Sequence, residues 1–211
     1  MAGVFPQDGL ELHVAESEPK DKNNVKERIV RAAAELFMER GFAGTTVREI
    51  GERAGVGQSS LYHHARSKGQ LLAELHATHV GDLVDMLEDV VQSPDAPTVQ
   101  LRRLIKALAL MVHTHRAVVT VYLRESYALS DEARAQVAME RKKIDTYIEL
   151  IIRRGLDSGE FRSDLDIQLT RRAILGMVNW TYQWYQPNGP QTIDQIGEFF
   201  ADFAVAAVTK D

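Results

Sequence analysis

The chain has 211 residues, a formal net charge of −5 and a hydrophobic content of 45%, which is ordinary for a globular protein. No apolar run is long enough to cross a bilayer, and the first residues lack the layout of a signal peptide, so we expect a cytoplasmic protein. The absence of cysteine excludes disulfides, thiolate catalysis and cysteine zinc sites.

The first part of the chain combines an irregular leader with a helix. Residues 1–22 show no hydrophobic period and carry scattered charge, which predicts a disordered leader. From Val25 to Phe37, apolar residues recur at the spacing of one helix face. Gly41 follows directly and is a typical residue for ending a helix.

Two short helices and one long helix are predicted next. Thr45 or Thr46 can cap the first short helix. The second covers about residues 58–64. Ser67 then caps a long helix, whose apolar residues continue to about residue 91.

A proline-containing break at residues 93–97 separates this long helix from the remaining ones. The later helices are predicted over about residues 98–113, a shorter stretch ending near 129, 131–157, 164–185 and 192–209. No stretch alternates polar and apolar residues with the period of a strand, so we predict an all-α chain.

The two short helices have the pattern of a helix-turn-helix. Ile50 and Ala54 face back from the first helix, and Leu61 faces back from the second. The small Ala54 lets the two backbones approach, and Gly55 accepts the left-handed conformation of the turn. With the helix before them they would form a three-helix bundle. On spacing alone, a generic helical hairpin with a polar outer face is an equal alternative.

The outward side chains of this unit suit a DNA surface. Most are short, polar or amphipathic groups that can enter a major groove and hydrogen-bond to bases or phosphates. The threonines lie at a helix N-terminus, where free N–H groups favour a phosphate oxygen, and a lysine starts the long helix. The predicted DNA-binding set is Thr45, Thr46, Gly57, Gln58, Ser59, Ser60, Tyr62, His63 and Lys68.

The distribution of charge agrees with a docking module on an acidic body. Residues 1–20 contain four acidic residues and one basic residue, and residues 21–68 contain nine basic and six acidic ones. Residues 69–211 contain fifteen basic and twenty acidic residues. A small positive segment on an acidic body fits a nucleic-acid-binding unit joined to a domain with another task.

Residues 41–62 read GFAGTTVREIGERAGVGQSSLY, a stretch that resembles the DNA-binding signature of the TetR family of bacterial regulators. The His63-His64 and Ser67-Lys68 that follow fit it as well. The resemblance implies a homodimer that reads a palindromic operator in double-stranded DNA, usually as a repressor. It also divides the polar set into phosphate contacts, from Thr46, Tyr62, His63 and Lys68, and base contacts, from Gln58, Ser59 and Ser60.

Two positions depart from the family's pattern. Ala65 stands where the family usually has an aromatic residue, and Gly69 where it usually has an acidic one. The missing aromatic removes a core side chain between the DNA-binding unit and the long helix. We therefore expect a looser joint at this point.

The C-terminal part places aromatic residues, methionines and a few polar groups among aliphatic ones. Such a composition is typical of an apolar small-molecule pocket, although simple core packing is the alternative for each residue. The candidate ligand-binding residues are Met111, His115, Tyr122, Glu125, Met177, Trp180 and Trp184.

Two stretches in this part, GLDSGEF at 155–161 and LGMVNWTYQWY at 175–185, resemble a branch of the family that regulates fatty-acid and sterol breakdown in actinobacteria. That resemblance implies an acyl-coenzyme A thioester as effector, with a hydrophobic drug-like ligand of an efflux regulator as the alternative. Basic residues could pair with its phosphates, although such residues are usually solvated. They are Arg102, Arg103, Arg141, Lys142, Lys143, Arg153, Arg154, Arg171 and Arg172.

The last two helices are more apolar than a small subunit needs, which predicts a dimeric four-helix bundle. Gly176 would allow a partner helix to approach closely. The expected interface residues are Ile174, Val178, Tyr182, Ile193, Ile196, Phe199, Phe200, Phe203, Ala204 and Val208.

Other constellations are weaker. His76 and His79 share a helix face with Asp82, but a fourth ligand is missing, so we predict no metal site and no cofactor. No phosphate-binding glycine loop or nucleophile elbow occurs, so an enzyme is disfavoured, as is a helical adaptor without DNA binding. The predicted parts are a leader at 1–22, a helix-turn-helix domain at 23–68, and a ligand-binding and dimerisation domain at 69–211.

Overall fold

The computed structural model describes residues 25–114, 116, 119–120 and 131–210, without the side chains of residues 76–79, 132–133 and 136. Within these ranges the chain is all-helical, as predicted, and no named strand occurs. The helices are α1 (Val25–Arg40), α2 (Val47–Ala54), α3 (Gln58–His64), α4 (Lys68–Gln92), α5 (Pro97–Thr114), α7 (Asp131–Ser158), α8 (Ile167–Trp184) and α9 (Ile193–Val208).

The helix ends follow local capping chemistry. Thr46 caps α2, and Thr192 caps α9, each in a reciprocal capping box with the residue three positions later. Asp166 caps α8, so this helix starts a few residues later than the predicted position 164. The predicted leader and most of the predicted short helix ending near 129 lie outside the described residues.

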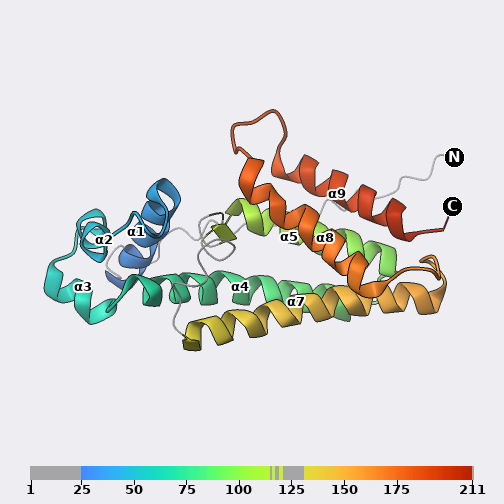
Figure 1. The fold of residues 1–211 in the computed structure, drawn as a ribbon, viewed down its shortest axis with the longest axis horizontal. Helices are drawn as coiled ribbons and strands as arrows, with labels where there is room; N and C mark the ends of the chain where they lie inside the picture. Colours follow the sequence, from blue (N-terminus) through green and yellow to red (C-terminus); the bar gives the residue numbers. More distant parts are fainter. Residues whose placement is uncertain (1–24, 115, 117–118, 121–130, 211) are drawn as a thin grey trace, which may run out of the picture.

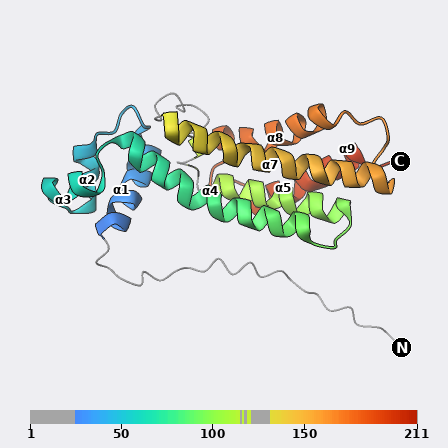
Figure 2. The same ribbon diagram turned by 90° about the horizontal axis from the view of Figure 1, so that it is seen from below.

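The molecule has a small head and a larger helical body, and α4 belongs to both (Figure 1). Helices α1, α2 and α3 form the head, while α5, α7, α8 and α9 form the body with the remainder of α4. Helix α7 begins close to the head and runs beside α4 (Figures 1 and 2). None of the described helices combines the length and apolarity needed to cross a bilayer.

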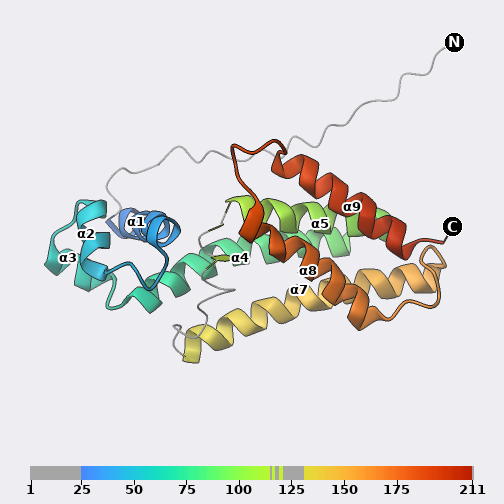
Figure 3. The same ribbon diagram turned by 45° about the horizontal axis from the view of Figure 1, so that its top comes forward.

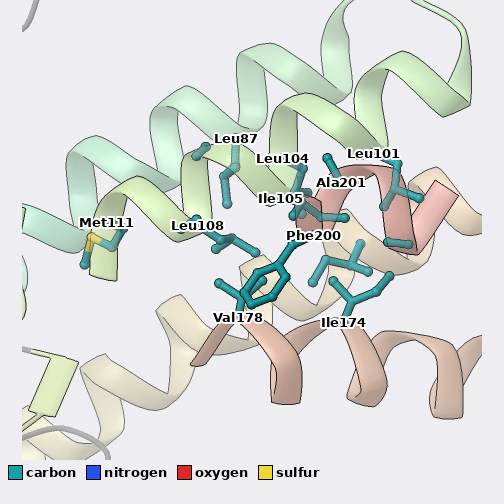
Figure 4. Packing of buried hydrophobic residues seen from close by; sticks show 14 of the residues in the cluster. Leu87, Leu101, Leu104, Ile105, Leu108, Met111, Ile174, Val178, Phe200 and Ala201 are labelled. Atoms are coloured by element: carbon teal, nitrogen blue, oxygen red, sulfur yellow. The ribbon is translucent and has the colours of Figure 1, made fainter. Parts of the chain in front are cut away.

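Two separate hydrophobic cores hold these parts together. The head core joins the apolar stripe of α1 to Ile50, Leu61 and the first turns of α4. Ala65 is fully buried within it, whereas the looser joint expected at this position stays a prediction. In the body core, the Phe200 ring of α9 lies between side chains of α5 and α8, close to Val178 (Figure 4).

The far end of the body is closed by the turn between α7 and α8, which lies beside the end of α9 (Figure 3). Gly159 has a φ of 77°, a left-handed conformation that favours glycine. Phe161 follows, fully buried, and its N–H donates to the Gly155 carbonyl at 2.9 Å. The N–H of Arg162 donates to the Val208 carbonyl at 2.9 Å, which fixes the end of α9 to this turn.

Gly155 is expected to be essential to this closure. A Cβ at this position would lie 2.2 Å from the Phe161 ring, so Gly155→Ala must displace a fully buried aromatic side chain. We expect a loss of about 1–3 kcal/mol in the free energy of unfolding, measured by urea denaturation. Combining it with Phe161→Leu should cost less than the sum of the two single changes; strict additivity would contradict the predicted clash.

Candidate nucleic-acid interface

A close contact between α2 and α3 sets the angle of the two short helices. A Cβ on Gly51 would lie 2.6 Å from Cδ2 of the buried Leu61, so glycine is what lets the helices approach here. Gly55 has a φ of 64°, and its N–H donates to the Glu52 carbonyl at 3.1 Å. The turn is therefore as predicted, but Gly51 as well as Ala54 provides the close approach.

Two arginines fix the pair of helices to α1. Arg28 donates from Nη2 to the Gly55 carbonyl at 2.9 Å and also to that of Ala54, at the C-terminal end of α2. Arg53 forms a bidentate pair with Glu39, with N–O distances of 2.9 and 2.8 Å. The hydrogen-bonded Arg53 guanidinium holds the pKa of Glu39 below its usual value. Both cations thus have structural partners inside the head.

The outer face of α3 presents four residues of the predicted DNA-binding set. Gln58, Ser59, Tyr62 and His63 are exposed, and Tyr62 is 55% exposed. The opposite face carries the buried Leu61, and α3 lies at the end of the head farthest from the body (Figure 1). The helix therefore presents an accessible polar ridge to a groove.

Ser60 and Gly57 differ from these four. Ser60 is half-buried at the edge of the ridge. Gly57 is the exposed N-cap of α3, with a φ of −69° and no atom within 4 Å of a built Cβ. Neither its backbone conformation nor the packing of the chain requires glycine at this position.

Thr45 does not lie on the DNA surface, contrary to expectation. It is 0% exposed, and its hydroxyl donates to the carbonyls of Gly41 at 2.8 Å and Leu36 at 3.2 Å. These bonds close the turn between α1 and α2. The structure therefore removes Thr45 from the candidate phosphate contacts, because its hydroxyl is enclosed by the head.

Thr46 is exposed, but its hydroxyl already has a role. It accepts from the Glu49 N–H at 3.2 Å and lies 2.7 Å from Glu49 Oε2, to which it donates. The Thr46 N–H donates to the same carboxylate at 2.8 Å, and the hydrogen bonds from Thr46 lower the pKa of Glu49. A phosphate oxygen only accepts hydrogen bonds, so Thr46 would have to give up Glu49 to donate to DNA.

Lys68 joins the start of α4 to the turn after α1. Its Nζ donates to the Phe42 carbonyl at 2.7 Å and lies 4.6 Å from the centroid of the Phe42 ring. An ammonium group has three donors, so a phosphate contact remains compatible with these bonds. The sequence did not indicate this link, because the two residues lie 26 positions apart.

The predicted ligand-binding residues separate into three groups. Met111 lies in the body core, and Met177 packs against it. Trp180 and Trp184, on the same helix as Met177, are 62% and 45% exposed in the single chain. The methionines thus lie in or against the body core, the tryptophans are largely exposed, and a common ligand pocket stays a prediction. His115, Tyr122 and Glu125 lie outside the described residues.

The basic residues proposed for phosphate recognition also separate by their partners. Several are paired within the chain: Arg102 with Asp202, Arg103 with Asp95, Arg154 with the Val91 carbonyl, and Arg171 with Asp145 and Glu149. Four exposed cations have no ion pair with another described residue, namely Lys142, Lys143, Arg153 and Arg172.

The expected interface set was largely wrong, because most of its members face the body core of their own subunit. The buried ones are Ile174, Val178, Ile193, Ile196, Phe200, Ala204 and Val208, and Tyr182 packs against them. Exposed apolar residues remain on both helices, namely Leu169, Ala173, Gly176, Trp180 and Trp184 of α8 and Phe199 and Phe203 of α9. We call this set the α8–α9 face.

The side chains of His76 and His79 lie outside the description, so their arrangement with Asp82 is not tested. Among the residues that the structure does describe, no group of three potential metal ligands occurs.

Comparisons with known proteins agree with this architecture. Residues 29–75 match the family of bacterial regulatory proteins called the tetR family, and residues 94–208 match the tetracyclin repressor-like C-terminal domain. The HTH-type transcriptional repressor KstR2 of Mycobacterium tuberculosis is 32% identical over 190 residues, covering 90% of this chain and 95% of that protein.

Solved structures give the same result. The structure of the ketosteroid transcriptional regulator KstR2 of Mycobacterium tuberculosis has a TM-score of 0.83 and 31% identity, covering 90% of this chain and 98% of that one. The structure of AibR in complex with isovaleryl coenzyme A and operator DNA has a TM-score of 0.75 and 28% identity, covering 85% of this chain and 97% of that one. The chain belongs to the TetR family of bacterial transcriptional regulators.

Proposed function

We propose that this protein is a ligand-responsive repressor that binds a palindromic operator as a homodimer. The observation that carries the proposal is the exposed polar ridge of α3 at the tip of the head. On this ridge, Gln58, Ser59 and, at its edge, Ser60 would contact bases, and Tyr62 and His63 would contact phosphates. Lys68, at the start of α4, would contact a further phosphate. Gly57 would let the DNA backbone approach the start of α3, since no intramolecular contact needs a glycine there.

Gln58 is the side chain of this ridge best suited to select a base. It has both a donor and an acceptor at its end, and the bidentate partner of glutamine in the major groove is adenine. The described helix α3 contains no lysine or arginine, so it offers no bidentate contact to guanine. We therefore assign an adenine to the position of the half-site that Gln58 contacts.

The effector that we propose is an acyl-coenzyme A thioester of lipid or sterol breakdown. Two observations support this class. The relatives named above include a ketosteroid regulator and a protein bound to isovaleryl coenzyme A. The body also carries exposed cations without acidic partners among the described residues, Lys142, Lys143, Arg153 and Arg172, which suit the phosphates of coenzyme A. These relatives favour a lipid-derived effector over the drug of an efflux regulator.

The α8–α9 face supplies the proposed dimer contact. Its largest side chains, Trp180 and Phe199, are 62% and 65% exposed in the single chain. A row of large exposed apolar groups at helical spacing marks an interaction surface, and a partner helix could approach at Gly176. Any contact of Trp180 or Trp184 with effector would then occur at the junction of two subunits.

The function is tested by binding to the DNA upstream of its own gene. Fluorescence anisotropy should show tight binding to this duplex and weaker binding to a scrambled duplex at the same salt concentration. Acyl-coenzyme A thioesters, from isovaleryl to long-chain and steroid-derived ones, should release the DNA and raise the melting temperature, whereas free coenzyme A should not. No release by any thioester would reject the effector class; equal affinity for both duplexes would reject the operator.

Two variants separate a neutral contact from a charged one. Tyr62→Phe should weaken operator binding about tenfold through loss of one hydroxyl, with an unchanged dependence on salt. Lys68→Met removes a cation, so the slope of log K against log salt should become less negative by about 0.9. Lys68→Arg, which keeps the charge, should retain the slope. A normal slope in the Lys68→Met protein would mean that Lys68 makes no phosphate contact and only binds the Phe42 carbonyl.

A charge on the α8–α9 face should disrupt the dimer. Trp180→Glu places a carboxylate on a surface that becomes desolvated when two subunits meet, so light scattering after size exclusion should show monomers. Met139→Glu is the matched control, because Met139 is 57% exposed on α7 and lies off this face. A Trp180→Glu protein that stays dimeric would place the interface elsewhere.

A further inference from the structure

Most lysines and arginines of the head are already bound to another part of the chain. Some pair with carboxylates and others donate to main-chain carbonyls. The ion pairs are Lys26–Glu74, Arg40–Glu49, Arg48–Glu52 and Arg53–Glu39, and the donors to carbonyls are Arg28 and Lys68. Among the lysines and arginines of residues 25–75, only Arg31 and Arg66 have side chains with no ion pair or hydrogen bond to another described residue, and both are exposed.

Arg66 lies in the short connection between α3 and α4, and the backbone around it is fixed (Figure 1). Ala65 before it is extended, with a φ of −145°, and is 0% exposed in the head core. Ser67 after it is also extended and caps α4. Because successive side chains of an extended segment point in opposite directions, the buried Ala65 directs Arg66 outward. The Arg66 N–H donates to Gln70 Oε1 at 3.1 Å, which holds the backbone and leaves the guanidinium available.

The segment that contains Arg66 has no acidic residue. Residues 53–73 include neither aspartate nor glutamate. The acidic residues on either side, Glu52 and Glu74, each pair with another cation of the chain. No carboxylate of its own segment therefore competes with a phosphate for the Arg66 guanidinium.

Arg31 is placed differently, although it is equally exposed. It lies on α1 between Arg28, which donates to the Gly55 carbonyl, and Glu35, which accepts from Arg53 at 3.4 Å. Residues three and four positions apart share a helix face, so Arg31 lies on the face of α1 next to the C-terminal end of α2. Arg66, in contrast, directly follows α3. Arg31 is therefore a matched control for the charge of Arg66.

We propose that Arg66 is a further DNA-contact residue, whose guanidinium binds a backbone phosphate beyond the C-terminal end of α3. This assignment rests on the proposed function, in which Gln58 and Ser59 contact bases from the start of the same helix. A phosphate bound at the other end fixes the depth and tilt of α3 in the groove. A guanidinium can bind two phosphate oxygens, and Arg66 does so without giving up a described bond. Arg66 thus contributes affinity for any duplex and no base preference.

The assignment is tested with the full chain on a random-sequence duplex over a series of salt concentrations, so that neither operator nor effector is needed. Arg66→Gln should make the slope of log K against log salt less negative by about 0.9, which is a loss of about eightfold in affinity at roughly 0.1 M salt. Arg66→Lys keeps the charge and should retain the slope. Arg31→Gln should also retain it. A normal slope in Arg66→Gln, or an equal change in Arg31→Gln, would overturn the assignment.

Neutral methylphosphonates, placed one at a time in the DNA from upstream of the gene, locate the contact. At one position the substitution should weaken binding of the parent chain about eightfold but leave Arg66→Gln unaffected, because that variant has already lost the pair. If every substitution weakens both proteins equally, no phosphate pairs with Arg66. A parent chain that binds no duplex would overturn the proposed function together with this assignment, whereas normal binding by Arg66→Gln would overturn the assignment alone.

Discussion

Burial of the two ends of α4 in two different cores is the constraint on which the rest of the structure depends. The helix has 25 residues, which corresponds to a length of about 37 Å. Its first turns complete the core of a head that is too small to bury enough apolar surface alone. Its later turns are one wall of the body. Helix α4 therefore sets the position of the head, including α3, relative to the body.

The cations of the head are mostly committed to this construction. Arg28 holds the C-terminal end of α2, Arg53 joins α2 to Glu39 of α1, and Lys68 joins α4 to the Phe42 carbonyl. The excess of basic residues in this part of the chain therefore overstates the charge available to DNA. The proposed recognition therefore depends more on the shape and the neutral hydrogen-bonding groups of α3 than the net charge of this segment would indicate.

The features that could be predicted from sequence are local ones. The capping threonines, the glycine of the turn and the apolar spacing of α1 to α4 depend on residues a few positions apart, so the helix-turn-helix was predictable in detail. The sequence could not show which of Thr45 and Thr46 caps α2, because this depends on which hydroxyl bonds to carbonyls at the end of α1. The same limit applied to Lys68, since its partner Phe42 is distant in the sequence.

The C-terminal helices show the limit most clearly. A periodic stripe determines which residues share a face, but both faces of α8 and α9 carry apolar groups, so periodicity could not decide which one packs on α5. The tertiary structure decided it by burying Val178 and Phe200, and it left Trp180 and Phe199 exposed. By itself the sequence determined the helical fold, the helix-turn-helix and the polar ridge of α3. Only the tertiary structure decided which apolar face is free for a partner and where the two cores separate, because both depend on contacts between residues far apart in the chain.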